Sequence, residues 1–325
     1  MLFAVSCTRV GPHSALEPAG TQAAHIDGLW RQLLWGCTIV YGVVMAALVL
    51  AVLKHNPAPD TQDLPEAARR RVVRIVSIAV GITILVLAWF MGATLSTERQ
   101  LAQLETKNPL TVKITGRQWW WEVLYEDQTP SNQFQTANEI HVPVGRPVHL
   151  RLFSADVIHS FWVPNLHGKR DLIPGRENSL WIQADRPGVY EGQCAEFCGM
   201  QHAHMRIVVV AQPEEEFEGW LQAQRRPAPE PETETQVRGR EVFLANTCVM
   251  CHTVRGTTAG SRAGPDLTHL ASRRTLGAAS IPNTRGHLAG WILDPQTIKP
   301  GNHMPPHTFE AEELRALLDY LESLK

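Results

Sequence analysis

The sequence predicts two membrane-spanning helices, then an all-β domain, then a small all-α domain. Three observations predict this order: two long uncharged apolar runs near the N-terminus, a middle stretch of short β-branched and aromatic segments, and a C-terminal part of helical character behind a Pro- and Glu-rich segment. The 325 residues leave room for two small domains besides the membrane segments. The expected parts are an N-terminal segment (1–27), a two-helix hairpin (28–95), the β domain (96–212), a linker (213–235) and the α domain (236–325).

The two apolar runs extend from Leu33 to Leu53 and from Ile75 to Ala93. Each is close to the roughly 20 residues that cross a bilayer, and a pair of buried core helices is the alternative. Basic residues lie between the runs or just inside them, at Lys54, at 69–71 and at Arg74. The positive-inside rule puts this connection in the cytoplasm. Both termini and both domains are then expected on the outer face, which makes the protein multi-pass.

The N-terminal segment holds an ambiguous cysteine, Cys7. It follows a short apolar run, as the lipidated cysteine of a lipoprotein signal peptide does, but only six residues precede it and none is basic. The segment is therefore interpreted either as the remnant of such a signal or as ordinary sequence.

The β domain is predicted from short segments separated by turn residues such as Pro and Gly. The net charge of −2 gives no electrostatic indication of nucleic-acid binding. An amphipathic helix is expected at 214–224, before an extended Pro-rich linker segment at 226–235. Several short strands separated by turns, as expected for the β domain, argue for a Greek-key sandwich or barrel. The expected strands are Thr111–Thr115, Trp119–Tyr125, Glu139–Val144, Val148–Phe153, Ser179–Gln183 and Met205–Val210.

A cluster of soft metal ligands lies near the end of the β domain. Cys194, Cys198, His202 and Met205 fall within twelve residues, and His159 lies upstream. Thiolate, thioether and imidazole ligands together select copper, and the second cysteine supplies a thiolate that could bridge a second copper. The Cys-x3-Cys spacing alone would also suit a disulfide, a thiol redox pair or a copper chaperone.

A second redox motif opens the α domain. Cys248, Cys251 and His252 form Cys-x-x-Cys-His, which is typical of covalent haem c attachment. A zinc knuckle or a redox-active pair is the alternative, although zinc would require further Cys or His ligands at regular spacing. Helices are expected at 236–246 and 310–324, on either side of the haem-binding part.

Together, these features resemble subunit II of a caa-type cytochrome c oxidase, over about residues 14–325. The resemblance implies a CuA cupredoxin domain and a class I cytochrome c domain. It implies that the backbone carbonyl of Glu196 is a copper ligand and that its side chain holds a magnesium ion shared with subunit I. The family pattern ends His-x-x-Met, which selects His202 and leaves His204 at the surface. The implied side-chain ligands of the binuclear copper centre are His159, Cys194, Cys198, His202 and Met205.

For haem c, the resemblance implies attachment through Cys248 and Cys251 and iron ligation by His252. The segment 264–267 resembles the one whose proline carbonyl orients this histidine. The loop 303–306 resembles the one that carries the distal ligand, which would be Met304. Met/His ligation suits electron transfer. The competing distal ligands are His269, His287, His303 and His307.

The implied function is electron transfer from haem c to the copper centre and on to subunit I, where oxygen is reduced to water. Within an aromatic segment at 116–122, Trp119 would be the residue through which electrons reach copper, or else a packing residue. Lys169, Asp171 and Arg176 resemble the segment that faces subunit I. Glu66 would be a solvated loop residue or lie at a proton-channel mouth.

The implied partners are subunit I, other oxidase subunits, and cytochrome c or a quinol–cytochrome c reductase as the electron donor. The implied location is the bacterial plasma membrane, with both redox domains on the periplasmic face. The alternatives kept are a CuA-bearing subunit of a nitric-oxide reductase, a thioredoxin-like copper chaperone and a free-standing electron-transfer module.

Overall fold

A computed structural model describes residues 11–54, 65–102 and 109–325. Cys7 lies outside the described residues, so its lipidation stays a prediction. The chain divides into two compact units. One is the helical pair within residues 24–104, and the other combines the β domain, the C-terminal domain and residues 11–23.

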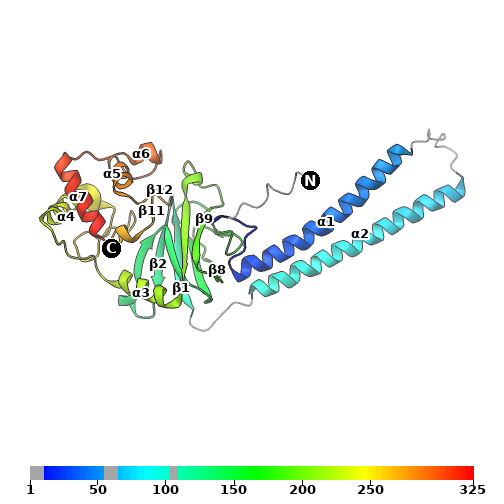
Figure 1. The fold of residues 1–325 in the computed structure, drawn as a ribbon, viewed down its shortest axis with the longest axis horizontal. Helices are drawn as coiled ribbons and strands as arrows, with labels where there is room; N and C mark the ends of the chain where they lie inside the picture. The colour runs from blue at the N-terminus through cyan, green and yellow to red at the C-terminus, as the bar shows by residue number, and fades with distance from the viewer. Residues whose placement is uncertain (1–10, 55–64, 103–108) are drawn as a thin grey trace. The chain divides into compact units, whose positions relative to one another are not determined.

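The first unit contains two long helices, α1 (Thr21–Leu53) and α2 (Glu66–Leu101), which form a hairpin (Figure 1). Both are long and apolar enough to cross a membrane, and each contains one of the expected apolar runs. A Cβ at Gly36 would lie 2.6 Å from Phe90 Cζ, so the glycine permits close contact between the helices. Glu66 is exposed in the first turn of α2, where it forms an ion pair with Arg70 at 2.5 Å.

The β domain is a sandwich of two five-stranded sheets, ordered β3-β2-β1-β5-β8 and β4-β10-β9-β6-β7. Most neighbours are antiparallel, but β1 pairs with β5 and β4 pairs with β10 in parallel. These connections confirm the sandwich that the sequence predicts. The strands are β1 (Leu110–Arg117), β2 (Trp120–Glu126), β3 (Phe134–Ala137), β4 (Glu139–Pro143), β5 (Val148–Ser154), β6 (His159–Trp162), β7 (Arg170–Leu172), β8 (Asn178–Ile182), β9 (Gly188–Cys194) and β10 (Arg206–Gln212).

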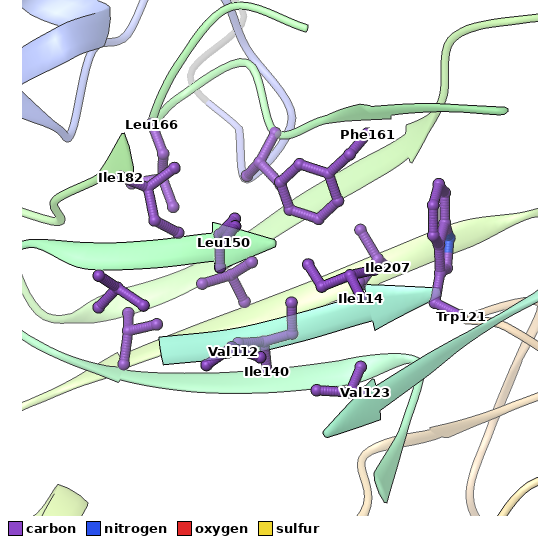
Figure 2. Packing of buried hydrophobic residues seen from close by; sticks show 14 of the residues in the cluster. Val112, Ile114, Trp121, Val123, Ile140, Leu150, Phe161, Leu166, Ile182 and Ile207 are labelled. Carbon is purple, nitrogen blue, oxygen red and sulfur yellow. The ribbon is translucent and has the colours of Figure 1, made fainter. Parts of the chain in front are cut away.

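The core of the sandwich follows from alternation along the strands. In β1 every second residue is buried, which directs Val112 and Ile114 inward. Trp121, Phe161 and Ile207 join them from other strands, as Figure 2 shows. This packing gives the metal-binding loops at the strand ends a rigid support.

Six of the ten strands match expected ones, and β3, β6, β7 and β9 were not predicted. The strand β9 contains two glycines and two polar residues, and β7 has only three residues, so their propensity signal is weak. Their position matters because β6 begins at His159 and β9 ends at Cys194.

The first part of the expected linker at 213–235 is the amphipathic helix that the sequence predicts at 214–224. It forms helix α3 (Glu214–Arg225), whose Phe217 and Leu221 are buried in the sandwich core. The extended part comprises residues 226–233, and two contacts hold it against the C-terminal domain. Ala228 N–H donates to the Arg255 carbonyl at 2.9 Å, and Glu230 pairs with Arg240 at 2.7 Å.

The C-terminal domain is built from α4 (Glu234–Ala245), α5 (Arg285–Leu293), α6 (Pro295–Ile298) and α7 (Ala311–Ser323). A capping box at Thr233 and Gln236 starts α4. A Cβ at Gly239 would lie 1.9 Å from the Ala316 carbonyl oxygen, so the crossing of α4 and α7 requires glycine. The domain is helical as expected, apart from a pair of two-residue strands, β11 (Thr275–Leu276) and β12 (Ile281–Pro282).

Candidate copper and haem centres

The soft ligands predicted from the sequence converge at one end of the sandwich. His159 begins β6, Cys194 ends β9, and the loop before β10 carries the others. His159 is fully buried, Cys194 and Cys198 are 2% exposed, and Met205 is fully buried. The ligand atoms of His159, Cys194 and Cys198 all lie within 4.8 Å of one another. The site is therefore built from two strands and one loop, and water has little access to it.

The distances between donor atoms suit shared metal ions. Cys194 Sγ lies 3.8 Å from Cys198 Sγ and 3.8 Å from His159 Nδ1. Cys198 Sγ lies 3.6 Å from His202 Nδ1 and 3.9 Å from Met205 Sδ. Two atoms bound at about 2.0–2.3 Å to one tetrahedral metal lie about 3.3–3.8 Å apart. The thiols are too far apart for a disulfide, whose sulfurs are about 2.05 Å apart.

Two further groups of the copper loop were singled out in the sequence. The Glu196 carbonyl oxygen accepts a hydrogen bond from Cys194 Sγ at 3.2 Å, so it faces the same site, whereas the Glu196 side chain is exposed. His204 is exposed and its Nδ1 lies 2.7 Å from Gln201 Oε1. His204 therefore lies at the surface, as expected.

His159 is held by a residue that sequence reasoning missed. Asp156 Oδ1 lies 2.8 Å from His159 Nε2, which leaves Nδ1 to face Cys194. A carboxylate on the far nitrogen of a metal-binding imidazole fixes its tautomer and orientation. Burial raises the pKa of Asp156, but hydrogen bonds from His159, Gln118 and Val157 outweigh it and leave the pKa below its usual value. The spacing Asp-x-x-His was the only sequence signal.

The pKa values of the two cysteine thiols are shifted in opposite directions. The hydrogen bond between the two thiols is the largest influence on Cys194, and it lowers the pKa of Cys194 to about 3 despite burial. The same bond raises the pKa of Cys198, and burial adds to the effect. The lowered pKa favours the thiolate at one sulfur, which is the form that binds metal. The second must lose its proton when metal binds.

Trp119 contacts the copper loop directly. Its indole Nε1 donates to the Cys198 carbonyl at 2.9 Å, and Gln118 Nε2 donates to the same oxygen at 2.8 Å. The Gln118 backbone N–H donates to Asp156 Oδ2 at 2.7 Å. Residues 118 and 119 thus brace the loop and the carboxylate that orients His159. Gln118 was not singled out from the sequence.

The C-terminal domain encloses a cavity of about 560 Å³, a size suited to a cofactor. Most of its walls are apolar. All four residues predicted to hold haem c line it: Cys248, Cys251, His252 and Met304. Four residues of the β domain close one side: Gln118, Trp119, Trp120 and Asn138.

His252 is oriented as the resemblance implied. Its Nδ1 lies 2.7 Å from the Pro265 carbonyl oxygen, which leaves Nε2 as the free ring nitrogen. Burial lowers the pKa of His252, and this favours the neutral imidazole that binds iron. Arg273, which lines the cavity, has a buried Nε without a hydrogen-bond partner in the described structure. The cavity, the oriented imidazole and the paired thiols fit a covalently bound haem.

Among the candidates for the distal ligand, two histidines are engaged elsewhere. Both ring nitrogens of His269 face backbone carbonyls, and exposed His287 contacts Thr284 Oγ1 at 2.7 Å. His303 and His307 do line the cavity, but His303 is exposed and His307 Nε2 lies 3.0 Å from Thr247 Oγ1. Met304 lines the cavity and packs on the core of the domain.

The fold and the two sites define a membrane-anchored electron-transfer protein with a copper-binding sandwich and a cytochrome c domain. Residues 127–212 match the family of the cytochrome c oxidase subunit II periplasmic domain, and residues 236–325 match the cytochrome c family.

Cytochrome c oxidase subunit 2 of Alkalihalophilus pseudofirmus is 33% identical to this chain, over 100% of this chain and 94% of that protein. The Bacillus subtilis subunit is 30% identical over 68% of this chain and 64% of that protein. A crystal structure of the periplasmic domain of subunit II of the Bradyrhizobium japonicum oxidase is 35% identical, covers 37% of this chain and 96% of that one, and has a TM-score of 0.35.

The chain belongs to the cytochrome c oxidase subunit 2 family and is the caa-type fusion, with the cytochrome c domain in the same chain. It is therefore the subunit of a haem–copper terminal oxidase that passes electrons to the oxygen-reducing subunit. Copper and haem c are its cofactors. These matches favour the oxidase over the nitric-oxide reductase kept as an alternative.

Proposed function

We propose that this subunit carries electrons from haem c to a binuclear copper centre through Trp119. The observation that supports this most is the position of Trp119: the residue lines the haem cavity, and its indole donates to the carbonyl of Cys198. A single side chain thus contacts both candidate centres. We infer that the electron donor is a cytochrome c or a quinol–cytochrome c reductase, which reduces the haem first.

The proposed copper ligands are the five side chains His159, Cys194, Cys198, His202 and Met205, with the Glu196 carbonyl as the sixth group. Cys194 and Cys198 would supply the two thiolates that hold the copper ions, and bound copper would supply one-electron chemistry. Asp156 keeps the His159 imidazole in place, and the buried site excludes water. The exposed Glu196 carboxylate is proposed to hold magnesium together with subunit I.

The proposed haem c is attached through Cys248 and Cys251 and ligated by His252 and Met304. His252 is fixed by Pro265, so its ring does not need to reorient when iron binds. Lys169 and Arg176 are exposed, Asp171 is partly so, and all three are available to face subunit I. We propose a multi-pass arrangement with both termini on the periplasmic face, and the domain limits given above.

The test is oxygen uptake by the purified oxidase with an artificial reductant. The intact complex is expected to turn over without added soluble cytochrome c and to contain two coppers and one covalent haem in this subunit. A complex whose subunit lacks residues 236–325 is expected to keep its copper absorption and to require added cytochrome c. Full turnover by the truncated complex with the artificial reductant alone would contradict the proposed route.

A further inference from the structure

A buried lysine joins the cytochrome c domain to the β domain beside Trp119. Lys299 follows α6 and is only 2% exposed. Its Nζ donates to the Trp119 carbonyl at 2.6 Å and to the Gly277 carbonyl at 3.1 Å. Gly277 belongs to the cytochrome c domain and Trp119 to the β domain, so one amino group connects the two domains across their contact.

Neighbouring residues extend this contact to the copper loop itself. Gln201 Nε2 donates to the Pro300 carbonyl at 2.6 Å, and a Cβ at Gly301 would lie 2.6 Å from Met200 Sδ. The backbone N–H of Arg206, the first residue of β10, donates to the Ala278 carbonyl at 3.1 Å. Pro300 and Gly301 therefore contact the copper loop, and Ala278 contacts the start of the strand that follows it.

The burial of Lys299 is not explained by stability. Moving an ammonium group out of water costs several kcal/mol unless it is paired, and an apolar residue of similar size is often at least as stabilising. In the described part of the chain, Lys299 has no carboxylate partner within ion-pair distance. Its two partners are neutral carbonyls. A buried lysine kept at such a position, against the residue that contacts both centres, points to a role in the function.

We propose that Lys299 is a positioning residue that clamps the cytochrome c domain onto the Trp119 face of the β domain. The inference rests on the proposed electron route, because the clamp matters only if Trp119 connects the two centres. It has a consequence for partners: the chain's own domain covers Trp119, so an external protein donor has to reduce the haem rather than the copper centre.

The test compares the wild-type oxidase with Lys299→Met, which keeps the length of the side chain and removes the ammonium. Lys325→Met, at the exposed C-terminal residue, is the control. The readout is hydrogen exchange, resolved to single residues, at the Arg206 amide, which bonds across the contact. The reference amides are Val208, bonded within the β domain, and Leu318, in α7. Optical spectra of copper and haem verify that both centres are intact.

Loss of the two hydrogen bonds from Lys299 Nζ is expected to accelerate exchange at Arg206 by roughly 10- to 100-fold in Lys299→Met. Val208, Leu318 and the control variant are expected to exchange as in the wild type. Unchanged exchange at Arg206 would overturn the clamp. So would equal acceleration at Leu318, because Lys299 would then only stabilise its own domain through Gly277.

A second measurement separates the clamp from the proposed function. Flash photoreduction of haem c gives the rate of electron transfer to copper in the wild type and in Lys299→Met. If the wild type shows no such transfer, the proposed route fails, and the exchange data alone decide whether the clamp exists. If the wild type transfers electrons and Lys299→Met does so more slowly with an unchanged haem potential, the positioning role is supported. An unchanged transfer rate in the variant would overturn it.

Discussion

Gly264 lies directly against the imidazole of His252. A Cβ at position 264 would lie 2.9 Å from His252 Cε1 and 3.1 Å from Nδ1, and the Gly264 N–H donates to the Cys251 carbonyl at 2.7 Å. The Gly264 backbone cannot move away from the His252 ring without breaking its hydrogen bond to Cys251. The absence of a side chain at 264 therefore allows the Pro265 carbonyl to reach the ring and fix its orientation.

Gly264→Ala is expected to displace the His252 ring and to destabilise the cytochrome c domain by about 1–3 kcal/mol, the usual cost of overpacking. Denaturant unfolding followed by the haem absorption band measures the loss. Gly260→Ala is the matched control, since nothing lies within 4 Å of a Cβ at that exposed glycine. Equal stability of the two variants would show that the ring has room to move.

Met304→Ala is expected to leave the haem covalently attached and to lower its midpoint potential, because a Met/His pair holds the potential high. We expect a decrease of more than about 59 mV, which is a tenfold change for one electron. Redox titration measures it. His307→Ala, at another residue lining the cavity, is the control and is expected to keep the potential close to that of the wild type. An unchanged potential in Met304→Ala would assign the ligand elsewhere, with His303 tested next.

The sequence predicted the parts of this protein that show a local hydrophobic pattern or carry a motif. The apolar runs at 33–53 and 75–93 lie within α1 and α2, and the Cys-x-x-Cys-His residues line one cavity. The strands β6 and β9 could not be predicted in the same way. Their polar and glycine residues form strands because they pair with each other and with β10, and such pairing depends on distant residues.

The groups that support the site were also beyond sequence reasoning. Gln118 and Cys198 are 80 residues apart and Lys299 and Trp119 are 180 apart, yet each pair is hydrogen-bonded. Nothing in the local pattern around Lys299 distinguishes it from a surface lysine. The candidate metal-binding residues could be predicted because copper requires particular ligand atoms. The residues that hold those candidates in place are set by contacts between distant parts of the chain.

Cys198→Ser is expected to reduce copper binding from two ions to at most one and to abolish the electron spin resonance signal of an electron shared by two coppers. The reason is that Cys198 Sγ lies between Cys194, His202 and Met205 in the donor set. Metal analysis and spin resonance of the purified subunit measure the change. Cys37→Ser, in α1, is the control and should bind copper normally. Retention of two coppers in Cys198→Ser would contradict the bridging role.

The stability of the β domain is expected to fall in acid because of His167. Burial, together with nearby Arg170, lowers the pKa of His167 to about 4, and its Nδ1 has no hydrogen-bond partner in the described structure. An unfolded histidine has a pKa of about 6.5, so between pH 6.5 and pH 4 the unfolded chain binds more protons than the folded one. The free energy of unfolding therefore decreases as pH falls through this window, by up to about 3 kcal/mol.

Unfolding of the detergent-solubilised chain by denaturant at pH 4, 5 and 7, followed by tryptophan fluorescence, measures this decrease. His167→Gln is expected to remove this part of the pH dependence, and His204→Gln, at an exposed histidine, is expected to retain it. Parallel curves for wild type and His167→Gln would show that another group causes the acid sensitivity.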